Sequence, residues 1–363
     1  MTRSYEWRLL GACVLVLANA CGDSGSEPHS NGPSKTAGGG GGKVSSTAGS
    51  GGAERRADGG RAASGQVGGP AMMRPAPMVE QPVQIGCIDD VSAGHHVYTC
   101  DNLSHDVEVP QKCLETQCGL VVDMHGGTMT AKQENDGTDM RELGEQFGYI
   151  VLQPNAPRGW VDPSVDAPTL ATMELLIKVF HLDENRVHMT GFSMGGYMTW
   201  RFICDHTDIL ASAAPMSAAT GGNPQEPPGC PFSETKKPTV EIPVLQLQGT
   251  MEPLIPRMAG EAQRDAVVTA WQMAPGEQVA GDATYRRIRY QNANQTVYEF
   301  IEHDYSSEAP FAGGIIGGHC FPGSPAQYDP AQPPGETKFG CQGSSSFHWG
   351  TEVMQFFIAH PKR

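Results

Sequence analysis

The sequence predicts an α/β fold in which a mostly parallel central sheet is flanked by helices. Short apolar runs typical of buried strands, such as residues 119–124, alternate with segments of helical periodicity, such as residues 170–180. A serine bracketed by glycines, Ser193, stands between a predicted strand and a predicted helix. Residues 217–241 contain no long amphipathic segment, so we expect no large helical lid over the sheet.

The composition divides the 363 residues into three parts. Residues 1–21 resemble an export signal, because two arginines precede an apolar run, residues 9–18, that is too short to span a bilayer. Residues 22–86 are rich in Gly, Ser, Ala and Pro and are interpreted as a disordered linker. The remaining residues, 87–363, are long enough for one large α/β domain.

Cys21 follows the apolar run in a context that fits two kinds of processing. Ala18 and Ala20 match an ordinary small-x-small cleavage site, while the same residues with Cys21 resemble a bacterial lipoprotein box. Of the ten cysteines, Cys13 lies within the signal, and pairing the other eight leaves Cys21 without a partner. We therefore predict lipid attachment at Cys21 and an exported protein, either extracellular or bound to the cell surface.

The net charge of −15 restricts the partners. Such an acidic chain is a poor match for nucleic acid and does not adhere to anionic membranes by charge. We expect contact with a membrane only through the lipid anchor, and we expect a monomer.

The eight remaining cysteines are predicted to form disulfides, because an exported protein folds in an oxidising compartment. A zinc site is the weaker alternative, since no pair shows the close spacing, repeated twice, of a four-ligand cage. Proximity along the chain guides the pairing. The expected pairs are Cys87 with Cys100, Cys113 with Cys118, Cys204 with Cys230, and Cys320 with Cys341.

Ser193 carries the clearest catalytic signal. In the pattern Gly-x-Ser-x-Gly, here with Gly191 and Gly195, the serine lies at a strained bend and its hydroxyl is held above the sheet edge. The backbone N–H of Met194 would then point toward a developing oxyanion. The alternative, an ordinary structural turn, is weakened by the strand before the serine and the helix after it.

A glycine-rich turn follows the strand at residues 119–124. Gly127 in this turn would supply the second oxyanion donor, because a residue without Cβ lets a carbonyl approach closely. We interpret His125 as a hydrogen-bonded loop anchor, since the base of such a site follows the serine in chain order. Trp160, after the next strand, is expected to line a substrate groove, with packing against its own loop as an equal alternative.

Glu252 and His319, which both follow Ser193 in the chain, are the candidates for its acid and its base. Glu252 stands in a turn at the carboxyl end of a predicted strand; its alternatives are a first-turn helix acid and, as a rival, Asp304. His319 lies in a glycine-rich loop suited to a general base. The other late histidines are expected to be structural or exposed: His303 on a strand, and His348 and His360 at the ends of the last helix.

Taken in order, these motifs resemble the polyhydroxybutyrate depolymerase and feruloyl esterase group of α/β-hydrolases, over roughly residues 119–361. The matching segments are residues 121–127, 183–196, 249–253 and 318–323. The resemblance implies that Ser193 is the nucleophile, Glu252 the acid and His319 the base. The family turn usually reads His-Gly-Thr-x-Asp, whereas this chain has Gln248 and Glu252.

The resemblance also implies an activity: hydrolysis of carboxylic esters through an acyl-enzyme, without a metal or organic cofactor. Export and an unlidded cleft favour a polymeric ester, first a polyester of the polyhydroxyalkanoate type. Feruloyl or acetyl esters of plant polysaccharide, and short soluble esters, are the alternatives within the same chemistry. A non-catalytic surface protein that keeps the fold is a second alternative, and a peptidase is disfavoured because no cap or propeller domain is recognisable.

Overall fold

A computed structural model describes most of the chain from residue 80 onward. The described residues are 80–156, 159–160, 162–219, 230–233, 235–331 and 337–362. The predicted export signal, Cys21 and most of the predicted linker lie outside the described residues. The backbone N–H of Val83 donates to the carbonyl of Val179 at 3.3 Å, and Ile85 packs against the core. Ordered contacts therefore begin before Cys87, the expected start of the folded region.

A ten-stranded sheet forms the centre of this part of the chain, with the order β1-β2-β4-β3-β5-β6-β7-β10-β9-β8. The six strands from β4 to β10 pair in parallel, and antiparallel strands extend both edges. The strands are β1 Gly94–Cys100, β2 Leu103–Val109, β3 Gly119–Met124, β4 Tyr149–Asn155, β5 Val187–Phe192, β6 Ser212–Met216, β7 Val244–Gly249, β8 Glu277–Gly281, β9 Tyr285–Gln291 and β10 Val297–His303. The mostly parallel sheet predicted from the sequence is confirmed.

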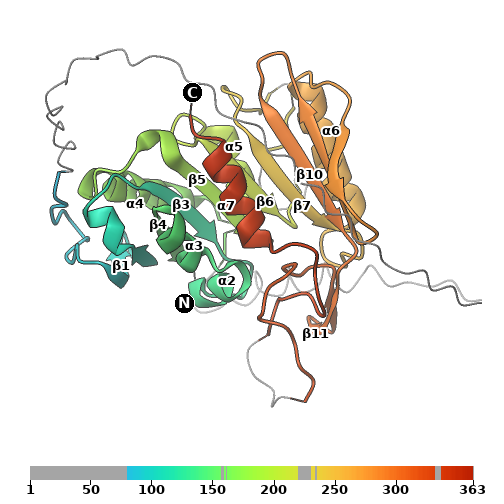
Figure 1. Ribbon diagram of the computed structural model, residues 1–363, viewed down its shortest axis with the longest axis horizontal. Helices are drawn as coiled ribbons and strands as arrows, with labels where there is room; N and C mark the ends of the chain where they lie inside the picture. The colour runs from blue at the N-terminus through green and yellow to red at the C-terminus, as the bar shows by residue number, and fades with distance from the viewer. Residues whose placement is uncertain are drawn as a thin grey trace, which may run out of the picture. The chain divides into compact units, whose positions relative to one another are not determined.

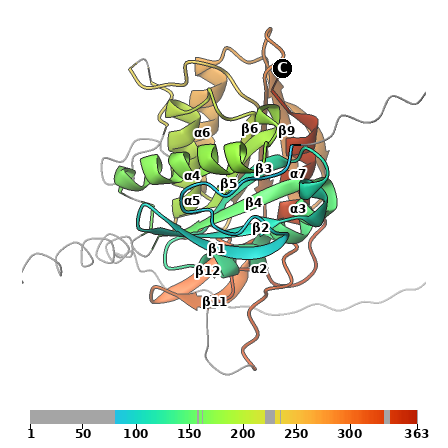
Figure 2. The same ribbon diagram turned by 90° about the vertical axis from the view of Figure 1, so that its left-hand side faces the viewer.

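Helices cover both faces of this sheet (Figures 1 and 2). Figure 2 shows α4, α5 and α6 on one side and α3 and α7 on the other. The helices are α2 Ala131–Thr138, α3 Met140–Phe147, α4 Asp166–Val179, α5 Met194–Asp205, α6 Arg257–Ala270 and α7 Trp349–Ala359, with short 3-10 helices at η1 Gln111–Leu114, η2 Pro163–Val165 and η3 Glu184–Arg186. A separate hairpin joins β11 Ser307–Phe311 to β12 Gly314–Gly317.

Each face of the sheet has its own apolar core. The central strands are buried on both faces, as their continuous apolar sequences predict. Met173 and Leu176 of α4 belong to one core cluster, and Val353 and Phe357 of α7 belong to the other. The burial of both faces holds the carboxyl ends of the parallel strands along one edge, where ligands bind in open α/β sheets.

All four predicted disulfides are present: Cys87–Cys100, Cys113–Cys118, Cys204–Cys230 and Cys320–Cys341. Proximity in sequence identified them because each bridge closes a loop of 26 residues or fewer. Among the described residues between β6 and β7 there is no helix. In the described part of the chain, no helix is both long and apolar enough to cross a bilayer.

Candidate active site

Ser193 lies at a sharp bend between β5 and α5. Its backbone has φ 53° and ψ −114°, a conformation that L-residues rarely adopt and that the surrounding structure must hold in place. Its N–H donates to the carbonyl of Met216 at 2.9 Å, which ties the bend to the end of β6. The residue is partly exposed, although Phe192 before it is buried. The bend is therefore the strand-to-helix elbow that the sequence predicts.

Glycines let this bend pack against the neighbouring strand. A Cβ on Gly195 would lie 2.0 Å from the carbonyl oxygen of Met124, and a Cβ on Gly191 would lie 2.5 Å from the carbonyl carbon of Gly195. Real Cβ atoms do not approach so closely, so a larger residue would push α5 away from β3. Both glycines of the motif are thus required for the position of Ser193.

His125 anchors the loop that follows β3. Its Nδ1 bonds the carbonyl of Gly126 at 2.7 Å, and its Nε2 accepts the N–H of Ala156 at 3.2 Å. Burial lowers the pKa of His125 to about 4, so the ring is neutral at physiological pH with its proton on Nδ1. The prediction of a hydrogen-bonded loop anchor is confirmed.

Gly127 of the same loop lies against the residue after Ser193. A Cβ on Gly127 would lie 2.6 Å from Sδ of Met194. The two residues predicted as oxyanion donors, Gly127 and Met194, are therefore neighbours on converging segments. A larger residue at this point of the loop would displace the side chain of Met194.

Trp160 has a different position from the one expected. It is fully buried, its indole N–H donates to the carbonyl of His125 at 2.7 Å, and its ring packs on the His125 imidazole. A side chain without exposed surface cannot line an open groove. Trp160 therefore does not line a groove but packs inside the protein, where its contacts support the loop that carries His125.

Glu252 and His319 form a buried pair. The carboxylate lies 2.8 and 2.9 Å from Nδ1 of His319 through its two oxygens. Its Oε1 also accepts the N–H groups of Leu254 and Ile255, each at 3.2 Å. These backbone bonds orient the carboxylate independently of His319. This arrangement holds the proton of His319 on Nδ1 and leaves Nε2 to act as a base.

Phe192 connects this pair to the elbow. Its ring lies 4.4 Å from the imidazole of His319 and 4.5 Å from the ring of Phe321, measured between ring centroids. The residue directly before Ser193 thus forms part of the surface on which the histidine rests. This role of Phe192 was not predictable from sequence, since the residue occupies the variable position of the Gly-x-Ser motif.

The rival residues are engaged elsewhere. Asp304 accepts the hydroxyl of Thr250 instead of bonding a histidine. His303 ends β10 in the core, where burial lowers its pKa to about 4. His348 caps the N-terminus of α7, and His360 bonds the carbonyl of Phe356 at its C-terminus. The structural roles predicted for these three histidines are confirmed.

Gly249 and Gly318 let the acid loop and the base loop meet. A Cβ on Gly249 would lie 2.3 Å from the carbonyl oxygen of Gly318, whose own N–H donates to the carbonyl of Met251 at 2.8 Å. We expect Gly249→Ala to separate Glu252 from His319 and to lower kcat more than tenfold. In the matched control Gly314→Ala, the nearest atom to the new Cβ is 3.9 Å away, and activity should be unchanged.

Steady-state ester hydrolysis and thermal unfolding of both glycine variants measure this effect. Equal activity of Gly249→Ala and Gly314→Ala would contradict the tight packing of the two loops.

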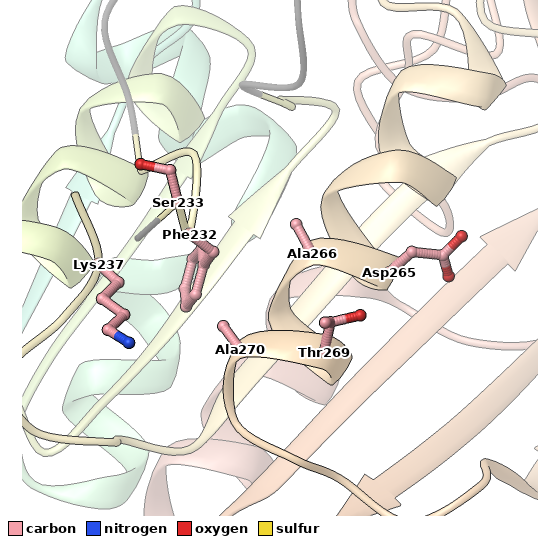
Figure 3. Close-up of a pocket in the computed structure, with 7 residues that line it drawn as sticks. All are labelled: Phe232, Ser233, Lys237, Asp265, Ala266, Thr269 and Ala270. Carbon is pink, nitrogen blue, oxygen red and sulfur yellow. The ribbon is translucent and has the colours of Figure 1, made fainter. Parts of the chain in front are cut away.

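A pocket of about 420 Å³ lies apart from these residues, between a loop and α6 (Figure 3). It shares no residue with the set around Ser193; its lining residues are Phe232, Ser233, Lys237, Asp265, Ala266, Thr269 and Ala270. Within the described ranges, no group of three or more His, Cys, Asp or Glu side chains is placed to hold a metal ion.

The strand order, the elbow between β5 and α5, and the histidine and acid from later loops define the α/β-hydrolase fold. The chain order Ser193, Glu252, His319 is the order in which that fold supplies a nucleophile, an acid and a base.

No family model matches the chain, but parts of it are similar to curated esterases and to a depolymerase. The chain is 31% identical over 124 residues to a probable acetylxylan esterase A of Neosartorya fischeri, covering 31% of this chain and 34% of the relative. It is 25% identical over 214 residues to poly(3-hydroxyalkanoate) depolymerase C of Paucimonas lemoignei, covering 55% and 48%. An acetyl xylan esterase structure from Aspergillus awamori matches 58% of this chain and 93% of its own, with 17% identity and a TM-score of 0.46. The chain thus spans from about a third to half the length of these two curated relatives.

Proposed function

We propose that the protein is an exported serine hydrolase that cleaves carboxylic ester bonds. The observation that carries the proposal is the buried Glu252–His319 pair, whose imidazole rests on Phe192 beside the strained Ser193. The names of the relatives, acetylxylan esterase and poly(3-hydroxyalkanoate) depolymerase, support ester hydrolysis as the reaction.

In the proposed mechanism, Oγ of Ser193 attacks the ester carbonyl carbon while Nε2 of His319 accepts the hydroxyl proton. The N–H groups of Gly127 and Met194 stabilise the negative charge on the carbonyl oxygen. The bond to the alcohol then breaks, and His319 returns the proton to the departing oxygen. Water then attacks the carbonyl carbon of the acyl-enzyme while Nε2 of His319 accepts its proton, and the proton passes to Oγ of Ser193 as the acid leaves.

The proposed substrate is a polymeric ester, first a polyester of the polyhydroxyalkanoate type. An export signal and a linker before residue 80 would display the domain outside the cell, where such polymers are found. Acetyl or feruloyl esters of plant polysaccharide are the second candidate, favoured by the acetylxylan esterase similarity.

A panel of substrates tests the proposal and separates these classes. The enzyme should hydrolyse p-nitrophenyl acetate and release hydroxyacid from polyhydroxybutyrate particles. Release of acetate from acetylated xylan, or of ferulate from bran, without attack on the polyester would shift the assignment to the second class. No hydrolysis of any ester by the intact, disulfide-bonded protein would reject the proposed function and favour a non-catalytic binding protein.

A further inference from the structure

A pair of carboxyl groups, Asp123 and Glu134, is buried beneath the His125 loop. Asp123 is the next-to-last residue of β3, Glu134 lies in the first turn of α2, and both side chains are almost completely shielded from solvent. Neither residue is part of the Ser193, Glu252 and His319 set. A buried carboxylate is costly unless it is paired with a donor, so this pair requires an explanation.

Each carboxyl group has one oxygen without a donor when both groups are ionised. Oδ2 of Asp123 accepts the hydroxyl of Thr138 at 2.9 Å and the amide of Gln153 at 2.8 Å, whereas Oδ1 has no hydrogen-bond donor. Oε2 of Glu134 is likewise without a donor. The two carboxyl groups interact with each other, and one proton held between them would give both unpaired oxygens a partner.

The proton belongs on Glu134. Burial, with the Asp123 charge second, raises the pKa of Glu134 well above its ordinary value. Burial also raises the pKa of Asp123, but only to about 6, because the bonds from Gln153 and Thr138 and the charge of Arg141 favour its carboxylate form. Protonated Glu134 then donates to Asp123 and accepts the backbone N–H of Gly126.

The contact between Glu134 and Gly126 lies next to the proposed oxyanion donor, Gly127. The peptide that joins Gly126 to Gly127 is held through the Gly126 carbonyl, which accepts the N–H of Met129 at 3.2 Å and bonds Nδ1 of His125. Glu134 holds the N–H of Gly126 on the other side of the same residue. With both groups of Gly126 fixed, the orientation of the following N–H, that of Gly127, is determined as well.

We infer that Glu134 and Asp123 share one proton and act as positioning residues that orient the N–H of Gly127 toward the oxyanion. The inference rests on the proposed function, because it assigns Gly127 the role of oxyanion donor. Neither carboxyl group touches the reacting atoms. Their effect is on the transition state, where the oxyanion charge is largest.

Two substitutions of Glu134 separate this role from simple packing. In Glu134→Gln, the amide N–H₂ can donate to Asp123 and the amide oxygen can accept from Gly126, so kcat should stay near the wild-type value. In Glu134→Ala both contacts are lost, and kcat should fall by roughly 10- to 100-fold with KM little changed. The exposed Glu145 on α3 provides the control, Glu145→Ala, for loss of a helix glutamate.

Stability against pH gives a second readout, which does not depend on activity. The native state holds a proton that the unfolded chain releases above pH 4.5, the ordinary pKa of the side chain, because burial raises the pKa of Glu134. Wild-type stability should therefore fall as pH rises. The Tm of Glu134→Gln should exceed that of the wild type by a margin that grows from about pH 5 to about pH 8.

Hydrogen exchange of residues 124–130 completes the test: Glu134→Ala should exchange faster than the wild type, and Glu134→Gln should not. The inference is overturned if Glu134→Gln loses as much activity as Glu134→Ala, or if its Tm advantage does not grow with pH. Wild-type protein without esterase activity would reject the proposed function, while exchange and Tm still decide whether the pair holds the loop. If Glu134→Ala fails to fold, the pH dependence of Glu134→Gln decides.

Discussion

Ser193→Ala is expected to abolish hydrolysis of every ester that the wild-type protein cleaves, with kcat reduced by about 10⁴- to 10⁶-fold. The hydroxyl is the only atom removed, and it is the atom that forms the acyl-enzyme in the proposed mechanism. The elbow itself should survive, since alanine keeps the Cβ and the Met216 contact is made by the backbone. Initial rates with p-nitrophenyl acetate, beside thermal unfolding of the same preparation, measure the effect.

Ser217 offers a matched control for that substitution. It directly follows β6, which pairs with the elbow strand β5, and it shares the positive φ of Ser193, at 46°, although it is fully buried. Its hydroxyl has no hydrogen-bond partner, so Ser217→Ala removes the same atom without removing a contact. This variant should keep most of the activity. Comparable losses in both serine variants would mean that Ser193 is not distinguished by its chemistry.

Glu252→Gln is expected to lower kcat by about 10³- to 10⁴-fold while the fold remains intact. The amide oxygen of the new side chain must accept the N–H groups of Leu254 and Ile255, as Oε1 does now. The amide nitrogen would then face Nδ1 of His319 and donate to it. The proton of the imidazole would move to Nε2, the nitrogen needed as the base.

Asp304→Asn is the control for this loss. Asp304 is the competing acid in the sequence, and its carboxylate accepts the hydroxyl of Thr250. Its activity should be close to that of the wild type. If Asp304→Asn were inactive and Glu252→Gln active, Asp304 would be the acid that pairs with His319. His319→Ala should be as inactive as Ser193→Ala, since the two residues act as a unit.

The sequence was sufficient for those parts of the structure that depend on local pattern. The buried strands β3 and β5, the elbow at Ser193 and the four disulfides follow from short segments or short separations. The chain order of acid and base selected Glu252 and His319, although the glutamate departs from the family turn. Its backbone donors, Leu254 and Ile255, show how the longer side chain is accommodated.

Features that depend on distant partners were not predictable in the same way. Strand β9 carries three arginines and does not resemble a strand that packs on a core. It pairs with β10, where Arg287 and Arg289 meet the buried Glu299, at 2.5 Å in the Arg289 contact. Hairpin β1–β2, which extends the opposite edge, was likewise missed.

The burial of single loop residues was also not predictable from the sequence. Trp160 was expected at a groove because it follows a strand at the ligand-binding edge, but the partner that buries it, His125, lies 35 residues away. The pairing of Asp123 with Glu134 depends in the same way on how α2 packs under β3. No periodicity or motif around Trp160, Asp123 or Glu134 indicates these contacts.

Covalent labelling with a fluorophosphonate tests the central claim most directly, because the reagent reacts only with an activated nucleophile. Trypsin should place Ser193 in the peptide that runs from residue 187 to residue 201. The account predicts one adduct per chain, mapped by mass spectrometry to Ser193, and its loss in His319→Ala. An adduct on another residue, or labelling of Ser193 that is unaffected by removal of His319, would contradict it.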